Sequence, residues 1–162
     1  MNASRLLSPT ASGHPTLEPE NSLPVTIYTD GACEPNPGPG GWAALLRCGQ
    51  HEKVITGSAE STTNNRMELT AAVQALQTLK RPCQVEIYTD SEYLKRGVTE
   101  WLPGWKKRNW RRKGGELKNV DLWQALDRAI SQHRITWRWI RGHNGHPENE
   151  RVDKLAVDAI RR

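Results

Sequence analysis

The tetrapeptide Ile-Tyr-Thr-Asp occurs twice in this chain of 162 residues, at Ile27–Asp30 and again at Ile87–Asp90. Each copy ends a short alternating run that predicts a β-strand, over Val25–Asp30 and over Val85–Asp90. Carboxylates at the ends of two strands can lie side by side at one edge of a sheet, where they repel each other unless a cation lies between them. The alternative is structural, because Asp is common in turns and at helix caps, and the repeat alone does not decide between the two.

The remaining pattern predicts a mixed sheet with helices packed on it. The segment Glu34–Gly41 is dense in Pro and Gly and is expected to be a loop, followed by a hairpin of strands Trp42–Arg47 and Lys53–Ala59. The predicted helices cover Arg66–Lys80, Glu92–Gly97, Val120–Gln132 (with Asn119 as its cap) and Glu150–Arg162, and a last strand covers Ile135–Ile140.

Two further carboxylates occupy positions where a charge is unfavourable. Glu68 lies at the top of the apolar stripe of its predicted helix, although a capping box with Asn65 as the cap would also explain it. Asp153 borders the buried face of the last helix, and no basic residue lies three or four positions away to pair with it. A metal ion would offset the cost of such an unpaired carboxylate. Together with Asp30 and Asp90, these residues are hard oxygen ligands that suit Mg²⁺ or Mn²⁺ rather than zinc.

Length and charge narrow the class of protein. A chain of 162 residues is most simply one domain, and it contains no apolar run long enough to predict a membrane span. The formal net charge is +5, and residues 106–113 hold a cluster of Lys and Arg, which favours an anionic partner. The three cysteines, Cys33, Cys48 and Cys83, form no Cys-x-x-Cys pair, so neither a zinc site nor a disulfide framework is predicted, and a reducing cytoplasm fits best.

Four segments stand out as motifs: YTDGACEPNPGPGGW (Tyr28–Trp42), TTNNRMEL (Thr62–Leu69), YTDSEYL (Tyr88–Leu94) and GHNGHPENERVDKLA (Gly142–Ala156). A fifth, KNVDLWQAL (Lys118–Leu126), carries no chemistry that we can assign. In this order they resemble the motifs of type-1 ribonuclease H in its bacterial form. The resemblance implies an α/β ribonuclease H-like fold, a five-stranded mixed sheet with strand 2 antiparallel and helices on both faces. It covers residues 25–162, and we expect residues 1–24 to be a disordered N-terminal extension.

The resemblance also implies an activity, the hydrolysis of the RNA strand of an RNA–DNA hybrid to 3′-hydroxyl and 5′-phosphate ends. Asp30, Glu68, Asp90 and Asp153 match the family's metal ligands and would hold two Mg²⁺ ions at the scissile phosphate, with Mn²⁺ possible. Asp30 would contact both ions, Glu68 and Asp90 would hold one, and Asp153 the other. His143 matches a mobile histidine that shuttles a proton or assists product release, the alternative being a solvated loop histidine.

The residues that contact the hybrid are implied in the same way. Polar groups that test for 2′-hydroxyls in the minor groove would be Cys33, Asn36, Asn64, Asn65 and Glu92, the last departing from a Gln in the bacterial form. A pocket for a DNA phosphate would be formed by Thr63, Asn36 and Arg66. A basic protrusion over about residues 101–113 would clasp the DNA strand through Trp101, Trp105, Lys106, Lys107, Trp110, Arg111 and Arg112. The alternative for this stretch is a solvated charged face with half-buried Trp rings.

Three other interpretations were weighed. A related integrase-like or resolvase-like nuclease on the same scaffold is disfavoured by the segment TTNNRME and by the basic protrusion. A non-catalytic hybrid-binding module would be expected to lack a carboxylate, and all four are present. A merely structural domain leaves Asp153 unexplained. The family further implies a monomer with no membrane partner.

Overall fold

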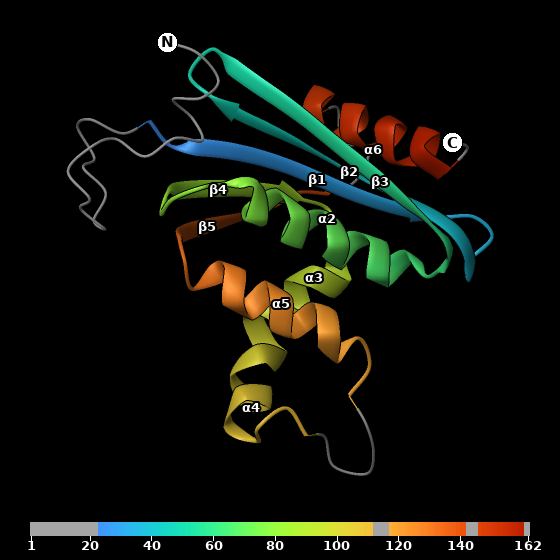
Figure 1. Ribbon diagram of the computed structural model, residues 1–162, viewed down its shortest axis with the longest axis vertical. Helices are drawn as coiled ribbons and strands as arrows, with labels where there is room; N and C mark the ends of the chain where they lie inside the picture. Colours follow the sequence, from blue (N-terminus) through green and yellow to red (C-terminus); the bar gives the residue numbers. More distant parts are fainter. Residues whose placement is uncertain (1–22, 112–116, 142–145, 161–162) are drawn as a thin grey trace.

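The predicted sheet is present and has five strands in the order β3-β2-β1-β4-β5 (Figure 1). This computed structural model describes residues 23–111, 117–141 and 146–160. The strands are β1 (Val25–Cys33), β2 (Gly38–Cys48), β3 (His51–Thr62), β4 (Gln84–Thr89) and β5 (Arg134–Trp139). Strand β2 runs antiparallel to β1 and β3, whereas β4 is parallel to β1 and β5 is parallel to β4. The predicted mixed sheet with an antiparallel second strand is therefore confirmed.

Helices cover both faces of this sheet, as expected. Helix α6 (Pro147–Ile160) packs on β1, β2 and β3 from one side, and α2 (Asn64–Thr78) packs on β1 and β2 from the other, with α5 (Val120–Ile130) against α2 (Figure 1). Between β4 and α5, the chain forms one uninterrupted helical segment composed of α3 (Glu92–Arg96), the π-helical turn η1 (Gly97–Trp101) and α4 (Leu102–Lys107). Figure 1 shows α4 directed away from the sheet.

The core has two parts because β2 buries residues on both of its faces. Side chains alternate across a strand, so Ala43 and Leu45 face α6, whereas Ala44 and Leu46 face the side of α2. The smaller part is completed by Val152 and Ala156 of α6. The larger part contains the fully buried residues Ile27, Leu69, Leu76, Ile87, Leu94, Trp123 and Leu126. Burial of each such side chain contributes about 1.5–3 kcal/mol, so the sheet and both helix layers depend on each other.

The loop predicted over Glu34–Gly41 is wrong in its second half, because β2 already begins at Gly38. Gly40 and Gly41 are paired with β1, at Cys33 and Ala32 respectively. A Cβ at Gly40 would lie 2.5 Å from the Thr62 methyl carbon, and one at Gly41 would collide with the carbonyl oxygen of Ala156. These glycines therefore permit close packing inside the sheet rather than marking a turn.

Other boundaries also move. Asp30 does not end its strand, because β1 continues to Cys33 through pairing with β2, whereas Asp90 does follow the last residue of β4. Helix α6 begins at Pro147 rather than Glu150, since Pro is favourable in the first turn of a helix. Asn119 precedes α5 but makes no capping hydrogen bond through its side chain. Of the extension predicted over residues 1–24 to be disordered, residues 1–22 lie outside the described residues. Within the described ranges, no helix is both long and apolar enough to cross a membrane.

A substitution of Gly97 tests how tightly the helical segment packs. A Cβ at Gly97 would collide with the indole ring of Trp123, which is fully buried. We expect Gly97→Ala to lower the free energy of unfolding by about 1–3 kcal/mol, measured by urea denaturation. The matched control is Gly104→Ala in α4, where the nearest atoms belong to the flexible end of Arg108, at 3.3 Å. That change should be neutral or stabilising by up to about 1 kcal/mol. Equal effects of the two substitutions would contradict the close packing of Gly97 on Trp123.

Candidate active site

Both copies of Ile-Tyr-Thr-Asp lie on neighbouring parallel strands in matched register. Ile27 pairs with Ile87 and Tyr28 with Tyr88, so the two aspartates come to equivalent places toward the carboxyl ends of these strands, which form one edge of the sheet. The two tyrosine rings stack, with centroids 4.9 Å apart. The sequence repeat is thus a structural repeat, and the predicted side-by-side placement of Asp30 and Asp90 follows from it.

Gly31 brings the third carboxylate to this edge. A Cβ at Gly31 would lie 2.5 Å from the backbone nitrogen of Glu68 and 2.5 Å from the carbonyl carbon of Met67. Only a glycine therefore lets β1 approach the first turns of α2 this closely, directly beside Asp30. The capping-box explanation of Glu68 is wrong, because α2 is capped by Thr63, whose hydroxyl accepts a hydrogen bond from the backbone N–H of Arg66 at 3.2 Å.

Asp30 is buried among other acids. The residue is only 8% exposed, and its pKa is raised to about 9. Burial is the largest cause of this rise, a hydrogen bond with Asp153 and the negative charges of Asp90 and Asp153 contribute to it, and a hydrogen bond from the Gly31 backbone opposes it. Asp153, carried by α6, thus reaches the strand carboxylates from the opposite face of the sheet to α2. All four predicted carboxylates interact directly or through their charges, because the charge of Asp90 also acts on Glu68.

Glu68 is held by two donors from the protein. The Ser91 hydroxyl donates to Glu68 Oε1 at 2.5 Å, and the Asn64 amide donates to Oε2 at 3.1 Å. The pKa of Glu68 is raised to about 7, mainly by burial and also by the charge of Asp90, while the hydrogen bonds from Ser91 and Asn64 limit the rise. Ser91 was not predicted as a site residue. Its hydroxyl also accepts from the Leu94 backbone N–H at 3.0 Å and so caps α3.

The donor set fits a hard divalent cation, because it consists of carboxylate oxygens whose mutual repulsion a cation would relieve. In the part of the chain that the structure describes, no three His, Cys, Asp or Glu side chains are already arranged around one metal position. Their oxygens are directed at protein partners instead: Asp30 bonds with Asp153, and Glu68 bonds with Ser91 and Asn64.

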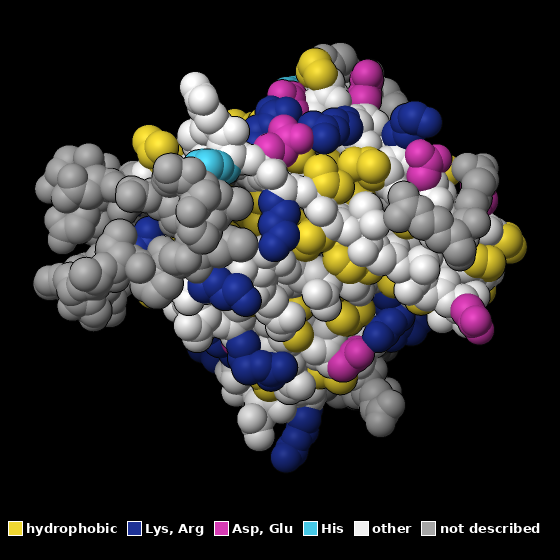
Figure 2. Space-filling view, turned by 45° about the horizontal axis from the view of Figure 1, so that its top comes forward, with side chains coloured by type: hydrophobic (Ala, Val, Ile, Leu, Met, Phe, Trp, Pro, Cys, Tyr) yellow, Lys and Arg dark blue, Asp and Glu magenta, His cyan; other side chains and the backbone are white. Residues whose placement is uncertain are grey.

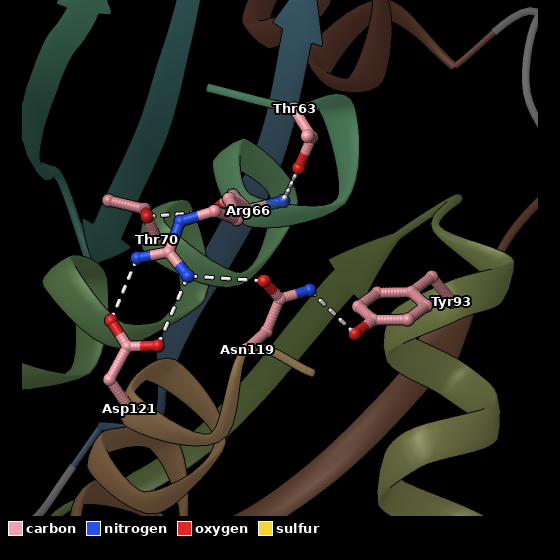
Figure 3. A network of polar contacts seen from close by, with 6 residues as sticks. All are labelled: Thr63, Arg66, Thr70, Tyr93, Asn119 and Asp121. Atoms are coloured by element: carbon pink, nitrogen blue, oxygen red, sulfur yellow. Dashed lines mark hydrogen bonds and ion pairs between the residues drawn. The ribbon is translucent and has the colours of Figure 1, made fainter. Parts of the chain in front are cut away.

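The predicted minor-groove residues lie at the same edge. Asn36 Oδ1 accepts from the backbone N–H of Asn64 at 3.1 Å, which ties the turn after β1 to the start of α2. The Cys33 thiol donates to the carbonyl of Thr62 at 3.4 Å and strengthens this connection. Asn36, Asn65 and Glu92 are exposed, so their polar groups are accessible to a ligand at this edge. Arg66 is different, because its guanidinium is already bonded to Asn119 and Asp121 (Figure 3).

The basic protrusion is built differently from what the sequence suggests. Lys106, Lys107 and Arg111 are exposed, as expected. Trp101, Trp105 and Trp110 are instead partly buried against the main core. Ring centroids lie 5.6 Å apart for Trp101–Trp105 and 5.4 Å apart for Trp105–Trp123, so the rings form an aromatic cluster that attaches the protrusion to the domain. The half-buried alternative thus describes their packing, and contact with substrate stays a prediction for their edges.

Two predicted residues, His143 and Arg112, lie outside the described residues. The structure adds Ser91, Tyr93, Lys118, Asn119 and Asp121 to the neighbourhood of the site. One signal pointed to the last three, since the matching segment KNVDLWQAL contains them without revealing their contacts. Ser91 could have been found as the residue after the second Ile-Tyr-Thr-Asp.

Fold and site together define a class of α/β domain with a largely buried cluster of carboxylates at the ends of its central strands and a basic protrusion. The sequence model described as RNase H matches residues 22–161. The chain is 62% identical over 137 residues to a ribonuclease H of Thiobacillus denitrificans, which covers 84% of this chain and 93% of that protein. It is 60% identical over 133 residues to a ribonuclease H of Hahella chejuensis, which covers 82% of this chain and 90% of that one.

Among solved structures, the crystal structure of LC9-RNase H1, a type 1 RNase H with the type 2 active-site motif, is 35% identical with a TM-score of 0.78. The match covers 86% of this chain and 72% of that chain. The chain belongs to the RNase H family.

Substitution of Asp30 tests the electrostatics of the cluster. Its pKa is near 4 in the unfolded chain and about 9 in the folded protein, so the folded state binds the extra proton and its stability falls as pH rises from about 4 through 9. In metal-free protein, Asp30→Asn should therefore raise the free energy of unfolding, by an amount that grows over this range to a few kcal/mol. Denaturation in EDTA at pH 5 and pH 9 measures it. The control Glu60→Gln removes an exposed charge and should change stability little. Destabilisation by Asp30→Asn at both pH values would contradict this account.

Substitution of Ser91 tests whether its hydroxyl orients Glu68. Ser91→Ala removes the donor to Glu68, so the pKa of Glu68 should rise further above about 7, and loss of the α3 cap should lower stability by about 1 kcal/mol. Ser91→Thr keeps a hydroxyl and should retain both properties. NMR titration of the Glu68 carboxyl in metal-free protein measures the first effect. An unchanged titration in Ser91→Ala would show that the hydrogen bond has no role in holding the charge.

Proposed function

We propose that this protein is an endoribonuclease that hydrolyses the RNA strand of RNA–DNA hybrids and leaves 3′-hydroxyl and 5′-phosphate ends. The observation that carries the proposal is the carboxylate cluster around the buried Asp30, whose pKa reaches about 9 because burial and neighbouring acids disfavour its charge. Such perturbed acids at a sheet edge are typical of a catalytic or metal-binding site. Membership of the RNase H family supports the choice of substrate.

The ligands of the proposed cations are Asp30, Glu68, Asp90 and Asp153. Bound Mg²⁺, or Mn²⁺ in its place, supplies activation of the attacking water and stabilisation of the leaving 3′ oxygen. Asp30 is central among the four, since it interacts with Asp90 and Asp153. Glu68 is kept oriented by Ser91 and Asn64. His143, which precedes α6 in the sequence and lies outside the described residues, is proposed to carry a proton or to assist product release, because an imidazole titrates near neutral pH.

Recognition of the hybrid is proposed to use polar groups at the same edge. Cys33, Asn36 and Asn64 connect the turn after β1 to α2, and Asn65 and Glu92 are exposed beside them. Hydroxyl groups of RNA both donate and accept hydrogen bonds, so amides and a carboxylate here can distinguish ribose from deoxyribose. Thr63 and Asn36 are candidates for contacting a DNA phosphate.

Positive charge supports binding of a polyanion. Lys106, Lys107 and Arg111 project from the protrusion, and Arg112 follows in the sequence. Figure 2 shows further Lys and Arg side chains spread over one face of the molecule, with fewer Asp and Glu among them. These contacts would carry no sequence information, and they would weaken steeply with salt. We further propose that the protein acts as a monomer in the cytoplasm.

The proposal is tested by comparing four labelled substrates with Mg²⁺ present: an RNA–DNA hybrid, double-stranded RNA, double-stranded DNA and single-stranded RNA. Only the RNA strand of the hybrid should be cut, with 5′-phosphate on the products. EDTA should stop the reaction, and added Mg²⁺ should restore it. Asp30→Asn should lose hydrolysis by about a thousandfold or more while still binding the hybrid, because it removes the central carboxylate. Glu60→Gln is the active control.

Three outcomes would overturn the proposal. Unchanged turnover in EDTA would exclude a role for divalent cations. Binding of the hybrid without any cleavage would favour the alternative of a non-catalytic module, whereas cutting of double-stranded DNA would favour an integrase-like or resolvase-like activity.

A further inference from the structure

Three helices meet at one polar junction that no predicted role explains (Figure 3). Arg66 of α2 donates through Nη2 to Asp121 Oδ2 at 2.8 Å and through Nη1 to Asp121 Oδ1 at 3.1 Å. Arg66 Nη1 also donates to Asn119 Oδ1 at 3.1 Å. Asn119 Nδ2 in turn donates to the hydroxyl of Tyr93 in α3 at 2.9 Å. The junction therefore connects α2, the start of α5 and α3.

Arg66 is committed to this junction. The three contacts use three of the five N–H donors of a guanidinium, and the two-point contact with Asp121 has the geometry that Arg and a carboxylate prefer. The hydrogen bond between the two side chains favours the charged form of each, because it raises the pKa of Arg66 and lowers that of Asp121. Both side chains are partly exposed, 35% and 62%, so solvent screens the pair, and its value lies in orientation more than in stability.

Asn119 occupies the N-cap position of α5 without a capping hydrogen bond from its side chain, so the orientation of that side chain depends on the junction. Its backbone is left-handed, with φ of 59°, a conformation that Asn tolerates better than most residues. Its amide oxygen faces a cation and its amide nitrogen faces a hydroxyl, so both ends of the side chain are fixed. The Tyr93 hydroxyl also accepts from Trp123 Nε1 at 3.1 Å, which ties the junction to the buried core.

The oriented residue forms one wall of a cavity of about 280 Å³. The other lining residues are Asn65, Tyr93, Trp101, Trp105, Leu117 and Lys118. Asn65 is three residues before Glu68 on α2, so the cavity lies next to the carboxylate edge. A nucleic acid bound at that edge would pass along this wall, and a misplaced Asn119 would weaken its binding.

We propose that Asp121 is a positioning residue for nucleic-acid binding: it holds Arg66 in place and, through Arg66, fixes Asn119 in the wall of the cavity. Arg66 then acts inside the protein and is not itself a ligand for phosphate. The expected effect on nucleic-acid affinity rests on the proposed function. The expected effect on the orientation of Asn119 rests on the junction alone.

The test compares Asp121→Asn with Glu100→Gln. Both remove one negative charge, but Glu100 makes only an exposed ion pair with Arg96, at 3.7 Å within one helical segment. Affinity for an uncleavable RNA–DNA hybrid is measured in EDTA over a range of salt, and KM and kcat are measured with Mg²⁺. Relative to Glu100→Gln, Asp121→Asn should raise Kd and KM about threefold to tenfold, leave kcat within about twofold, and leave the salt slope unchanged. The double variant Arg66→Gln with Asp121→Asn should bind no more weakly than the weaker single variant, because both act through one junction.

If Arg66 itself binds phosphate, the effect of Asp121→Asn on hybrid affinity has the opposite sign. Asp121→Asn would then free the guanidinium, tighten binding and steepen the salt slope, and that result would overturn the inference. A structural readout separates this failure from failure of the proposed function. The side-chain amide NMR signals of Asn119 should shift in Asp121→Asn and stay in place in Glu100→Gln. If those signals do not move in Asp121→Asn, the inference is wrong even where the wild-type protein cuts hybrids. If they move but the wild-type protein binds no hybrid, the proposed function fails while the junction stands.

Discussion

Repulsion between buried carboxylates is the constraint on which the rest of this structure depends. The sheet, α2 and α6 each contribute acids to one edge, and Asp30 is so poorly solvated there that its pKa rises to about 9. A fold tolerates such an arrangement only where other interactions over-determine it. Here they are the core on both faces of β2 and the absence of a side chain at Gly31, which together hold β1 against α2.

Hydrogen bonds then decide how each acid is presented. Ser91 and Asn64 hold the two oxygens of Glu68, and the second of these residues is itself tied to Asn36 in the turn after β1. Groups proposed to bind cations and groups proposed to recognise the hybrid are therefore mechanically connected. The junction of Arg66, Asn119 and Asp121 extends the same connection to α5. The turn after β1 is thus connected to the carboxylate of Glu68 through hydrogen bonds, while the junction connects α2 to α5.

Much of the fold could be predicted from local pattern, and the failures have identifiable causes. The helices and the parallel pairing of the two Ile-Tyr-Thr-Asp strands followed from periodicity and repetition. The prediction that Gly40 and Gly41 lie in a loop was wrong, because composition cannot distinguish a turn glycine from one that lets a neighbouring element pack closely. The three Trp residues of the protrusion misled for a similar reason, since only the tertiary structure reveals the cluster that they form with Trp123. The bonds of Ser91 and Asp121 join residues 23 and 55 positions apart, beyond the reach of any local signal.

The uninterrupted helical segment from Glu92 to Lys107 constrains the number of residues between the carboxylates and the lysines of the protrusion. It begins two residues after Asp90 and ends at the lysines of the protrusion, so helical backbone rather than an irregular loop sets where these lysines lie relative to the carboxylates. The helical segment thus fixes the relative positions of the two groups. Inserting or deleting a single residue would rotate Lys106 and Lys107 about the helix axis by about 100°. The position of these lysines relative to the carboxylates therefore depends on the exact number of residues in the segment.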